Sequence, residues 1–161
     1  DTEMTAHFGL ITGSRVYIIA QEESNQSIGY SIRIGMHHHL THGSHGKAIV
    51  AYMAEEEREK ILAEEEIGFY GDGVPFDKSR LLEEFKEIRR TGYGVDSRET
   101  NPNIIGISSP VFNGDGTIMG CVILVGVFSR VKLKKKGALV AATALGISRT
   151  LGFRGAFPAG G

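Results

Sequence analysis

The residues best able to do chemistry gather between positions 37 and 45, where five of the six histidines stand: His37, His38, His39, His42 and His45. The spacings from His39 to His42 and from His42 to His45 are compatible with shared binding of a metal ion. No cysteine accompanies them, and the HExxH pattern of helical zinc sites is absent. Three interpretations stay open: solvated or packing histidines, a metal site on His39, His42 and His45, and protonation at about pH 6.

The cluster runs into a predicted helix start at Ser44-His45-Gly46-Lys47. Ser44 is a residue type that caps helices, because its hydroxyl can accept a hydrogen bond from a free N–H of the first turn. The first N–H groups of a helix lack partners inside it, and the helix dipole favours an anion there. Gly46 would let a ligand approach the backbone. The sequence therefore predicts either a plain Ser44 cap or a binding position for a small carboxylate near Ser44 to Gly46.

Two further residues could contribute to a site. Asp96 ends a predicted strand, so its carboxylate could accept a hydrogen bond from a ligand hydroxyl or simply cap a turn. Cys121 is the only cysteine and lies in the most apolar stretch, which predicts a small buried core residue. The sequence contains no Ser-His-Asp arrangement, phosphate loop or glycosidase pair in a recognisable context. It therefore gives no argument for catalysis.

The elements that must position these residues centre on the stretch from Gly92 to Val127. Strands are predicted at Gly92–Asp96, Ile104–Phe112 and Ile118–Val127, and the turn Asn113-Gly114-Asp115-Gly116 makes a hairpin of the last two. The last strand is almost continuously apolar, so both of its faces should be covered. This hairpin is therefore expected in the middle of a sheet.

Other strands and helices are predicted on either side of this stretch. Alternation predicts strands at Thr5–Ile11, Arg15–Gln21 and Ile28–Ile34. Periodicity and end signals predict helices that begin at Ser44, run from Glu55 to Glu66, run from Asp77 or Ser79 to Gly92, and run from about Ser129 to Gly152. Lysines at 132 and 134–136 would oppose the dipole of the last helix, which favours a later start. Strands in hairpins with helices between them predict an α+β domain with an antiparallel sheet.

The composition is that of one ordinary globular domain, with 161 residues, 41% hydrophobic residues, 23% charged residues and a net charge of -1. The balanced charge argues against a general attraction to nucleic acid or membrane. A single cysteine allows no disulfide within the chain, which fits a reducing cytoplasm. The given sequence shows no signal-peptide pattern, and no apolar run in it has transmembrane length. The chain opens without methionine, so we expect a fragment of a longer protein.

Several segments resemble the effector-binding domain of IclR-type transcription regulators. The segment GSHGKAIVAYM resembles a helix start of that family, LLEEFKEIRRTGYGVDSRE resembles its helix-to-strand segment, and IGISSPVFNGDGTIMGCVILVGV resembles its hairpin. The last helix, ending in ISRTLG, resembles the family's final helix, and the order and spacing match over nearly the whole chain. The resemblance implies a GAF-like fold, a curved antiparallel sheet of about six strands with helices on both faces, over residues 1–161 as a single effector-binding domain.

The resemblance also implies a function. The chain would be the ligand-sensing and oligomerisation domain of a cytoplasmic bacterial regulator, a homodimer or homotetramer with no enzymatic activity, cofactor, metal or membrane partner. Operator DNA would be bound through a separate N-terminal winged helix-turn-helix domain that this chain lacks. The effector would be a small organic acid. The family's effector-binding positions fall on Ser44, His45, Gly46, Asp96, Gly106, Cys121, Ile123 and Val125.

Ile123 and Val125 depart from relatives that bind very small polar acids, which carry hydroxyl side chains at these positions. A hydroxyl or carboxylate buried against these two residues would lack a partner, so we expect an aromatic or moderately apolar acid. Two alternatives use other residues. One is a metal-sensing or pH-sensing domain built on the histidine cluster, and the other is a GAF-like thiol enzyme, which would need accessible cysteines of low pKa.

Overall fold

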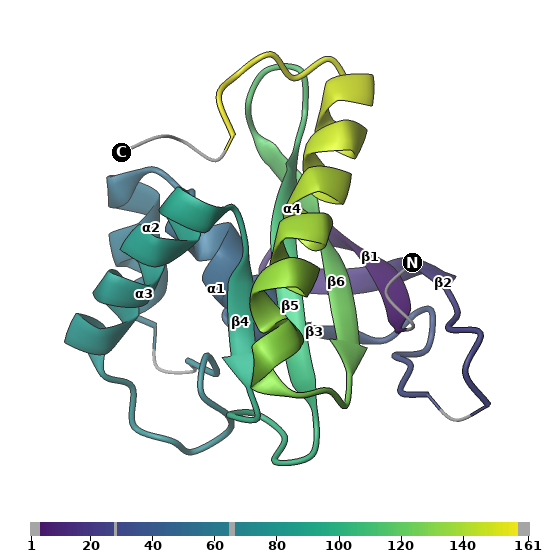
Figure 1. The fold of residues 1–161 in the computed structure, drawn as a ribbon. Coiled ribbons are helices and arrows are strands. Elements are labelled where there is room, and N and C mark those ends of the chain that lie inside the picture. Colours follow the sequence, from purple (N-terminus) through teal and green to yellow (C-terminus); the bar gives the residue numbers. More distant parts are fainter. Residues whose placement is uncertain (1–3, 28, 65–66, 158–161) are drawn as a thin grey trace.

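A computed structural model describes residues 4–27, 29–64 and 67–157 of the chain. Six strands form one antiparallel sheet in the order β3-β2-β1-β6-β5-β4 (Figure 1). The strands are β1 (Thr5–Thr12), β2 (Arg15–Glu22), β3 (His37–His39), β4 (Gly94–Ser97), β5 (Ile105–Phe112) and β6 (Ile118–Gly126). The helices are α1 (Gly43–Ala51), α2 (Glu55–Leu62), α3 (Lys78–Thr91) and α4 (Leu133–Thr150), with a short 3-10 turn at Arg130–Lys132. The predicted α+β class with about six antiparallel strands is therefore confirmed.

The β5–β6 hairpin lies inside the sheet, as its apolar sequence predicts. Every residue of β5 is buried, and so are the last seven residues of β6. The turn is closed by the N–H of Asn113, which donates to the carbonyl of Thr117 at 2.8 Å. Asp115 accepts a hydrogen bond from the N–H of Thr117 at 3.0 Å, and Gly116 adopts a positive φ of 86°. These are the turn residues that permit such a reversal.

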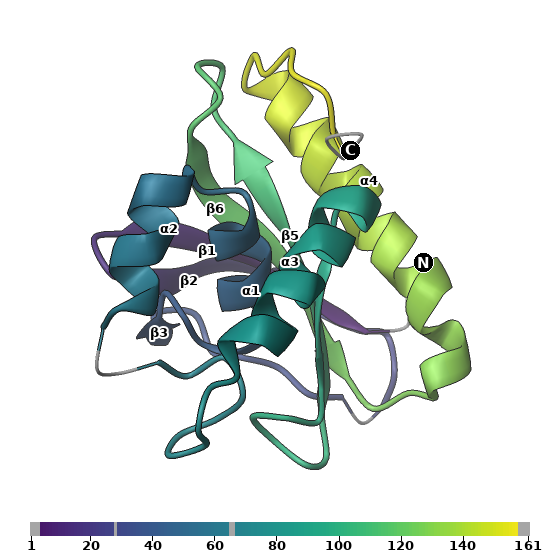
Figure 2. The same ribbon diagram turned by 90° about the vertical axis from the view of Figure 1, so that its left-hand side faces the viewer.

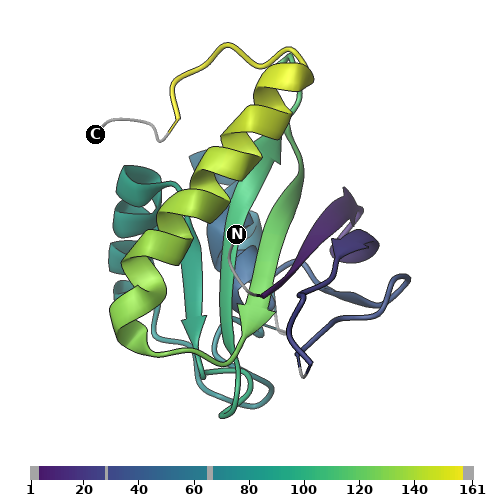
Figure 3. The same cartoon turned by 45° about the vertical axis from the view of Figure 1, so that its right-hand side comes forward.

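Helices cover both faces of the hairpin. Figure 2 shows α1, α2 and α3 together on one face, and Figure 3 shows α4 lying diagonally across β5 and β6 on the other. One core cluster includes Ile49, Phe85 and Ile123, and the other includes Ile107 and Val140. Figure 3 also shows β1 and β2 turning away from the plane of β5 and β6, so the sheet is curled. The curl leaves the concave side facing α1.

Most of the predicted helix ends are confirmed. Asp77, not Ser79, caps α3, since its carboxylate accepts from the N–H of Arg80 at 3.0 Å. Gly92 ends that helix in the left-handed conformation, with its N–H donating to Ile88. The last helix begins at Leu133, later than Ser129, but the lysines at 134–136 still lie in its first turn, where they oppose the helix dipole. α2 ends at Leu62 and is shorter than predicted, while the predicted end at residues 65–66 lies outside the described residues.

The strand predicted at Ile28–Ile34 is wrong where it can be judged. Residue 28 lies outside the described residues, and residues 29–33 have no strand structure. Instead, the N–H of Ile32 donates to the His7 ring at 2.9 Å, and the side chain of Ile34 is 59% exposed. The third strand beside β2 is His37–His39, which pairs with residues 15–17. The alternation of isoleucines indicated a half-buried strand, but pairing with β2 decided which segment formed one.

Candidate functional site

A cavity of about 210 Å³, called here the inner cavity, lies between the start of α1 and strands β4, β5 and β6. The expected effector-binding positions that line it are Ser44, His45, Asp96, Gly106, Ile123 and Val125. The other two expected positions, Gly46 and Cys121, do not line it. The lining residues that were not among the expected effector-binding positions are Tyr30, Ser31, Ile32, His38, His42, Gly43, Thr100, Asn101 and Ile104.

Ser44 is not the helix cap that the sequence predicts. The cap position is His42, without a side-chain capping bond, and Ser44 is the second residue of α1. Its hydroxyl lies 2.8 Å from the hydroxyl of Ser108 on β5, and both side chains are buried. A Cβ on Gly106 would lie 2.8 Å from the Ser44 hydroxyl oxygen, so glycine at this position permits the close approach. The Ser44 hydroxyl therefore bonds the Ser108 hydroxyl on the sheet and does not bond a backbone N–H of the first helical turn.

Gly46 has a different role from the one predicted. A Cβ there would lie 2.4 Å from the carbonyl carbon of Thr41 and 2.8 Å from the carbonyl oxygen of Leu40. The glycine therefore lets the chain before α1 pack on the helix, and does not admit a ligand. Cys121 is fully buried, as predicted, and burial raises the pKa of its thiol to about 12. A thiol in that state is not a nucleophile at neutral pH, which argues against the thiol-enzyme alternative.

Asp96 both caps a turn and faces the inner cavity. Its carboxylate accepts from the N–H of Glu99 at 2.7 Å, and from the N–H and hydroxyl of Thr100. The side chain is 6% exposed, and the loop from 97 to 100 is held by these bonds. The sequence left open whether Asp96 caps a turn or faces a ligand, and in the structure it caps the turn and also lines the cavity. Because its acceptor positions are already used, Asp96 contributes mainly shape and negative charge.

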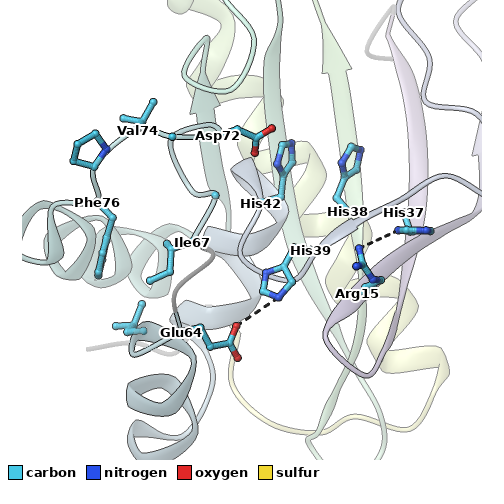
Figure 4. Close-up of a pocket in the computed structure, with 14 residues that line it drawn as sticks. Arg15, His37, His38, His39, His42, Glu64, Ile67, Asp72, Val74 and Phe76 are labelled. Atoms are coloured by element: carbon cyan, nitrogen blue, oxygen red, sulfur yellow. Dashed lines mark hydrogen bonds and ion pairs between the residues drawn. The ribbon is translucent and has the colours of Figure 1, made fainter.

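Three imidazoles meet at the top of the inner cavity, but they are not the three that sequence spacing suggests. The rings of His38 and His42 are stacked, with centroids 4.5 Å apart and planes at 10°. The His45 ring lies 5.9 Å from His38 and 5.7 Å from His42. His39 turns away and pairs with Glu64 at 3.5 Å (Figure 4). The candidate metal set of His39, His42 and His45 therefore does not converge, and across the described ranges no group of three or more His, Cys, Asp or Glu is placed to hold a metal ion.

The imidazole cluster is uncharged at neutral pH. Burial, with the neighbouring histidines, lowers the pKa of His38 to about 4 and that of His45 to about 3. Burial also lowers the pKa of His42, against the opposing influence of Asp72 and Asp96. Two neutral rings can stack face to face, whereas two imidazolium rings would repel each other. The inner cavity is thus roofed by neutral groups that can donate or accept hydrogen bonds.

A second and more open pocket of about 960 Å³, called here the outer pocket, lies on the other side of the histidines (Figure 4). One wall carries Arg15 and the histidines of β3, and the opposite wall carries the loop from 72 to 76. Of the residues that the structure describes, His38 and His42 alone line both spaces. The sequence shows that five histidines lie close together along the chain, but it could not predict that His38 and His42 form this shared wall.

The chain matches the family described as "Bacterial transcriptional regulator IclR C-terminal" over residues 1–149. The transcriptional repressor AllR of Escherichia coli K12 is 26% identical over 153 residues, covering 93% of this chain and 56% of AllR. The transcriptional regulator BhcR of Paracoccus denitrificans is 28% identical over 112 residues, covering 70% of this chain and 40% of BhcR. The chain thus spans about half the length of these curated relatives.

Solved structures agree with this match. The crystal structure of Thermotoga maritima IclR superposes with a TM-score of 0.83 at 30% identity, over 94% of this chain and 63% of that one. These similar proteins are transcriptional regulators and not enzymes. Within the described residues, no helix has the length and apolarity needed to cross a bilayer. The predicted GAF-like architecture is confirmed, and the chain belongs to the IclR family of bacterial transcriptional regulators, as its C-terminal effector-binding domain.

Proposed function

We propose that this chain senses a small organic acid in the inner cavity. The observation that carries the proposal is a cavity in which the first turn of α1 faces an apolar wall. Within the described residues, the N–H groups of Ser44 and His45 have no acceptor, as expected for the first turn of a helix. A carboxylate placed there would accept both hydrogen bonds and gain from the helix dipole.

The charge of the inner cavity supports binding of an acid together with a proton. Among the described residues that line it there is no lysine or arginine, and Asp96 is the one carboxylate. An incoming carboxylate would therefore find its positive partner in the amides of α1 and in a neighbouring imidazole such as His45. A nearby anion raises the pKa of an imidazole. Effector binding is then linked to proton uptake, and affinity rises as the pH falls below the pKa that this imidazole has in the complex.

The remainder of the effector contacts apolar residues. Ile123 and Val125 of β6 and Ile32 and Ile104 of the loops line the cavity away from α1. Ile123 is 2% exposed and Val125 9% exposed, so a polar group placed against them would be cut off from water and unpaired. An aromatic or moderately apolar acid fits this wall better than a short hydroxy or keto acid.

The site lies at the start of α1, so effector binding could be transmitted to the rest of the protein through this helix. The relatives are named HTH-type regulators, and this chain covers about half of their length. We propose that in the intact cytoplasmic protein the effector shifts α1 and the loop before it, and so changes a homodimer or homotetramer. That change would alter the spacing of winged helix-turn-helix domains and hence their fit to operator DNA.

The proposal is tested by thermal unfolding with benzoate, phenylacetate and hexanoate, and with benzamide as the uncharged partner of benzoate. At about 100 times Kd an acid stabilises the native state by ~2.7 kcal/mol, or about 5–11 °C in a domain of this size. We expect at least one acid to do so, benzamide to have no effect, and His45→Ala to reduce the shift. The matched control is His37→Ala, because His37 does not line the inner cavity. The proposal fails if none of these acids raises the midpoint, or if His45→Ala and His37→Ala behave alike.

A further inference from the structure

The inner cavity and the outer pocket are separated by two side chains. His38 comes from β3, His42 precedes α1, and no other residue in the described ranges lines both spaces. Figure 4 shows the two rings side by side, seen from the outer pocket and pointing the same way. Their centroids are 4.5 Å apart, so the partition is one pair of stacked rings.

This partition is weakly held. In the described part of the chain neither the His38 ring nor the His42 ring makes a hydrogen bond, whereas His39 bonds Thr41 at 2.9 Å and His45 bonds a backbone carbonyl at 3.4 Å. Stacking alone contributes only a small part of the stability of a domain. A rotation of either ring about its side-chain bonds would therefore open the partition without breaking a hydrogen bond.

The charged groups around the pair do not lock it. Asp72 faces the rings from the loop, Asp96 from β4, and the neutral His45 from α1. His37 is a further neighbour, and its ring lies 3.4 Å from the Arg15 guanidinium. Neither carboxylate is within salt-bridge distance of the His38 or His42 ring. Within the described residues, no ion pair therefore fixes either ring in place.

The outer pocket offers an apolar surface beyond the partition. Val74, Pro75 and Phe76 form it on the loop, joined by Ile67 and by Leu62 at the end of α2. Val74 is 46% exposed, so this surface is accessible. A space of about 960 Å³ is at the upper end of the size of small-molecule sites, while the inner cavity of about 210 Å³ alone is small for one.

We propose that the two spaces form one site with two chambers for an elongated acid. The carboxylate lies at the start of α1, the chain passes where the His38–His42 stack opens, and the apolar end reaches Val74 and Phe76. This inference rests on the proposed function for the position of the carboxylate. It adds the class of ligand, a straight-chain or extended monocarboxylic acid, and a role for the stacked histidines as a movable partition.

The test is isothermal titration of the protein with acetate, butyrate, hexanoate and octanoate. If the chain enters the outer pocket, affinity rises by about fourfold for each added buried methylene and continues to octanoate. Val74→Glu should then weaken octanoate by at least tenfold and leave butyrate unchanged. The same substitution at Val131, which is 91% exposed and lines neither chamber, is the matched control and should change neither acid. His42→Ala should increase the ratio of octanoate to butyrate affinity.

Two results would overturn the inference. One is an affinity that stops rising after butyrate, which would confine the ligand to the inner cavity. The other is a Val74→Glu effect that is equal for butyrate and octanoate. In both cases a short acid still binds, so the proposed function stands while the second chamber is rejected. Absence of binding by all four acids, together with no stabilisation by benzoate, would remove the proposed function and this inference together.

Discussion

Replacing Lys47 by methionine should destabilise the domain far more than an ordinary lysine substitution. Lys47 lies on α1, one turn after Ser44, and its side chain is only 1% exposed. Its ammonium nitrogen is 2.5 Å from a carboxylate oxygen of Glu99 and 2.8 Å from one of Glu84. It also lies 4.5 Å from the centre of the Tyr70 ring. Methionine keeps the length of the stem and removes the charge.

The expected loss follows from what the substitution leaves behind. The side chains of Glu84 and Glu99 are 27% and 18% exposed, so both would keep a partly buried charge without the lysine. Removing one partner of a buried ion pair costs about 3–5 kcal/mol. Arg80 also contacts both carboxylates and compensates in part, which favours the lower limit of about 3 kcal/mol. For a domain of this length that corresponds to a fall of about 6–12 °C in Tm.

The control is an ion pair of the same length that is exposed to solvent. Lys60 and Glu56 on α2 are also 2.8 Å apart, but their side chains are 73% and 83% exposed. Lys60→Met should therefore cost no more than about 0.5 kcal/mol. Urea unfolding followed by circular dichroism measures both variants, with the free energy of unfolding obtained by linear extrapolation.

Equal losses for Lys47→Met and Lys60→Met would refute the reasoning, because distance and not burial would then decide the energy. A second readout is salt. Screening at about 1 M NaCl shortens the Debye length to about 3 Å and should weaken the exposed pair but leave most of the Lys47 effect. If high salt abolished the Lys47 effect, the network would be solvated and the structural description of it wrong.

Three further results are expected. Gly46→Ala should cost about 1–3 kcal/mol, since its Cβ would lie 2.4 Å from backbone, while Gly146→Ala, with open space on α4, should stabilise by about 0.8–1 kcal/mol. Ser44→Ala should cost about 1–3 kcal/mol by leaving the buried Ser108 hydroxyl unpaired, and Ser108→Ala added to it should cost little more. The folded pKa of His45, about 3, lies below its unfolded value, so stability should fall by about 1.4 kcal/mol per pH unit below about pH 6.5, and His45→Gln should flatten that slope.

Urea unfolding measures the first two sets, and repeating it from pH 7 to 4.5 measures the third. A stabilising Gly46→Ala would contradict the close approach of the chain before α1. Fully additive losses for Ser44→Ala and Ser108→Ala would show that the two hydroxyls do not depend on each other. An unchanged pH slope in His45→Gln would mean that His45 is not the buried neutral group described above.

The parts of the fold that the sequence predicts well are those decided within a few residues. Asp77 caps α3 and Gly92 ends it because a carboxylate and a residue without Cβ satisfy the helix ends locally. The Asn113 to Thr117 turn closes through its own hydrogen bonds. These features need no knowledge of the rest of the chain, and the resemblance to a family then placed them in order.

The errors are at positions where two distant segments compete. The strand predicted at Ile28–Ile34 has a suitable alternation, but His37–His39 pairs with β2 in its place. Ser44 has the right chemistry for a cap, but Ser108, 64 residues away, takes its hydroxyl. His39 has the right spacing for a metal site with His42 and His45, but its ring lies beside Glu64 and outside the imidazole cluster. In each case local chemistry was read correctly, and a tertiary partner changed the outcome.

The position of α1 limits how a ligand signal can leave the site. Ser44 faces the inner cavity and bonds β5 through Ser108, and Lys47, three residues later, bonds Glu84 on α3. A helix held at both points cannot fray at its first turn without breaking a buried hydrogen bond or a buried ion pair. If an effector displaces Ser44, as the proposed function requires, we expect α1 to move as a rigid unit and to carry α3 with it. We therefore propose α3, which is bonded to α1, as the element through which a change in the inner cavity would reach a neighbouring subunit or domain.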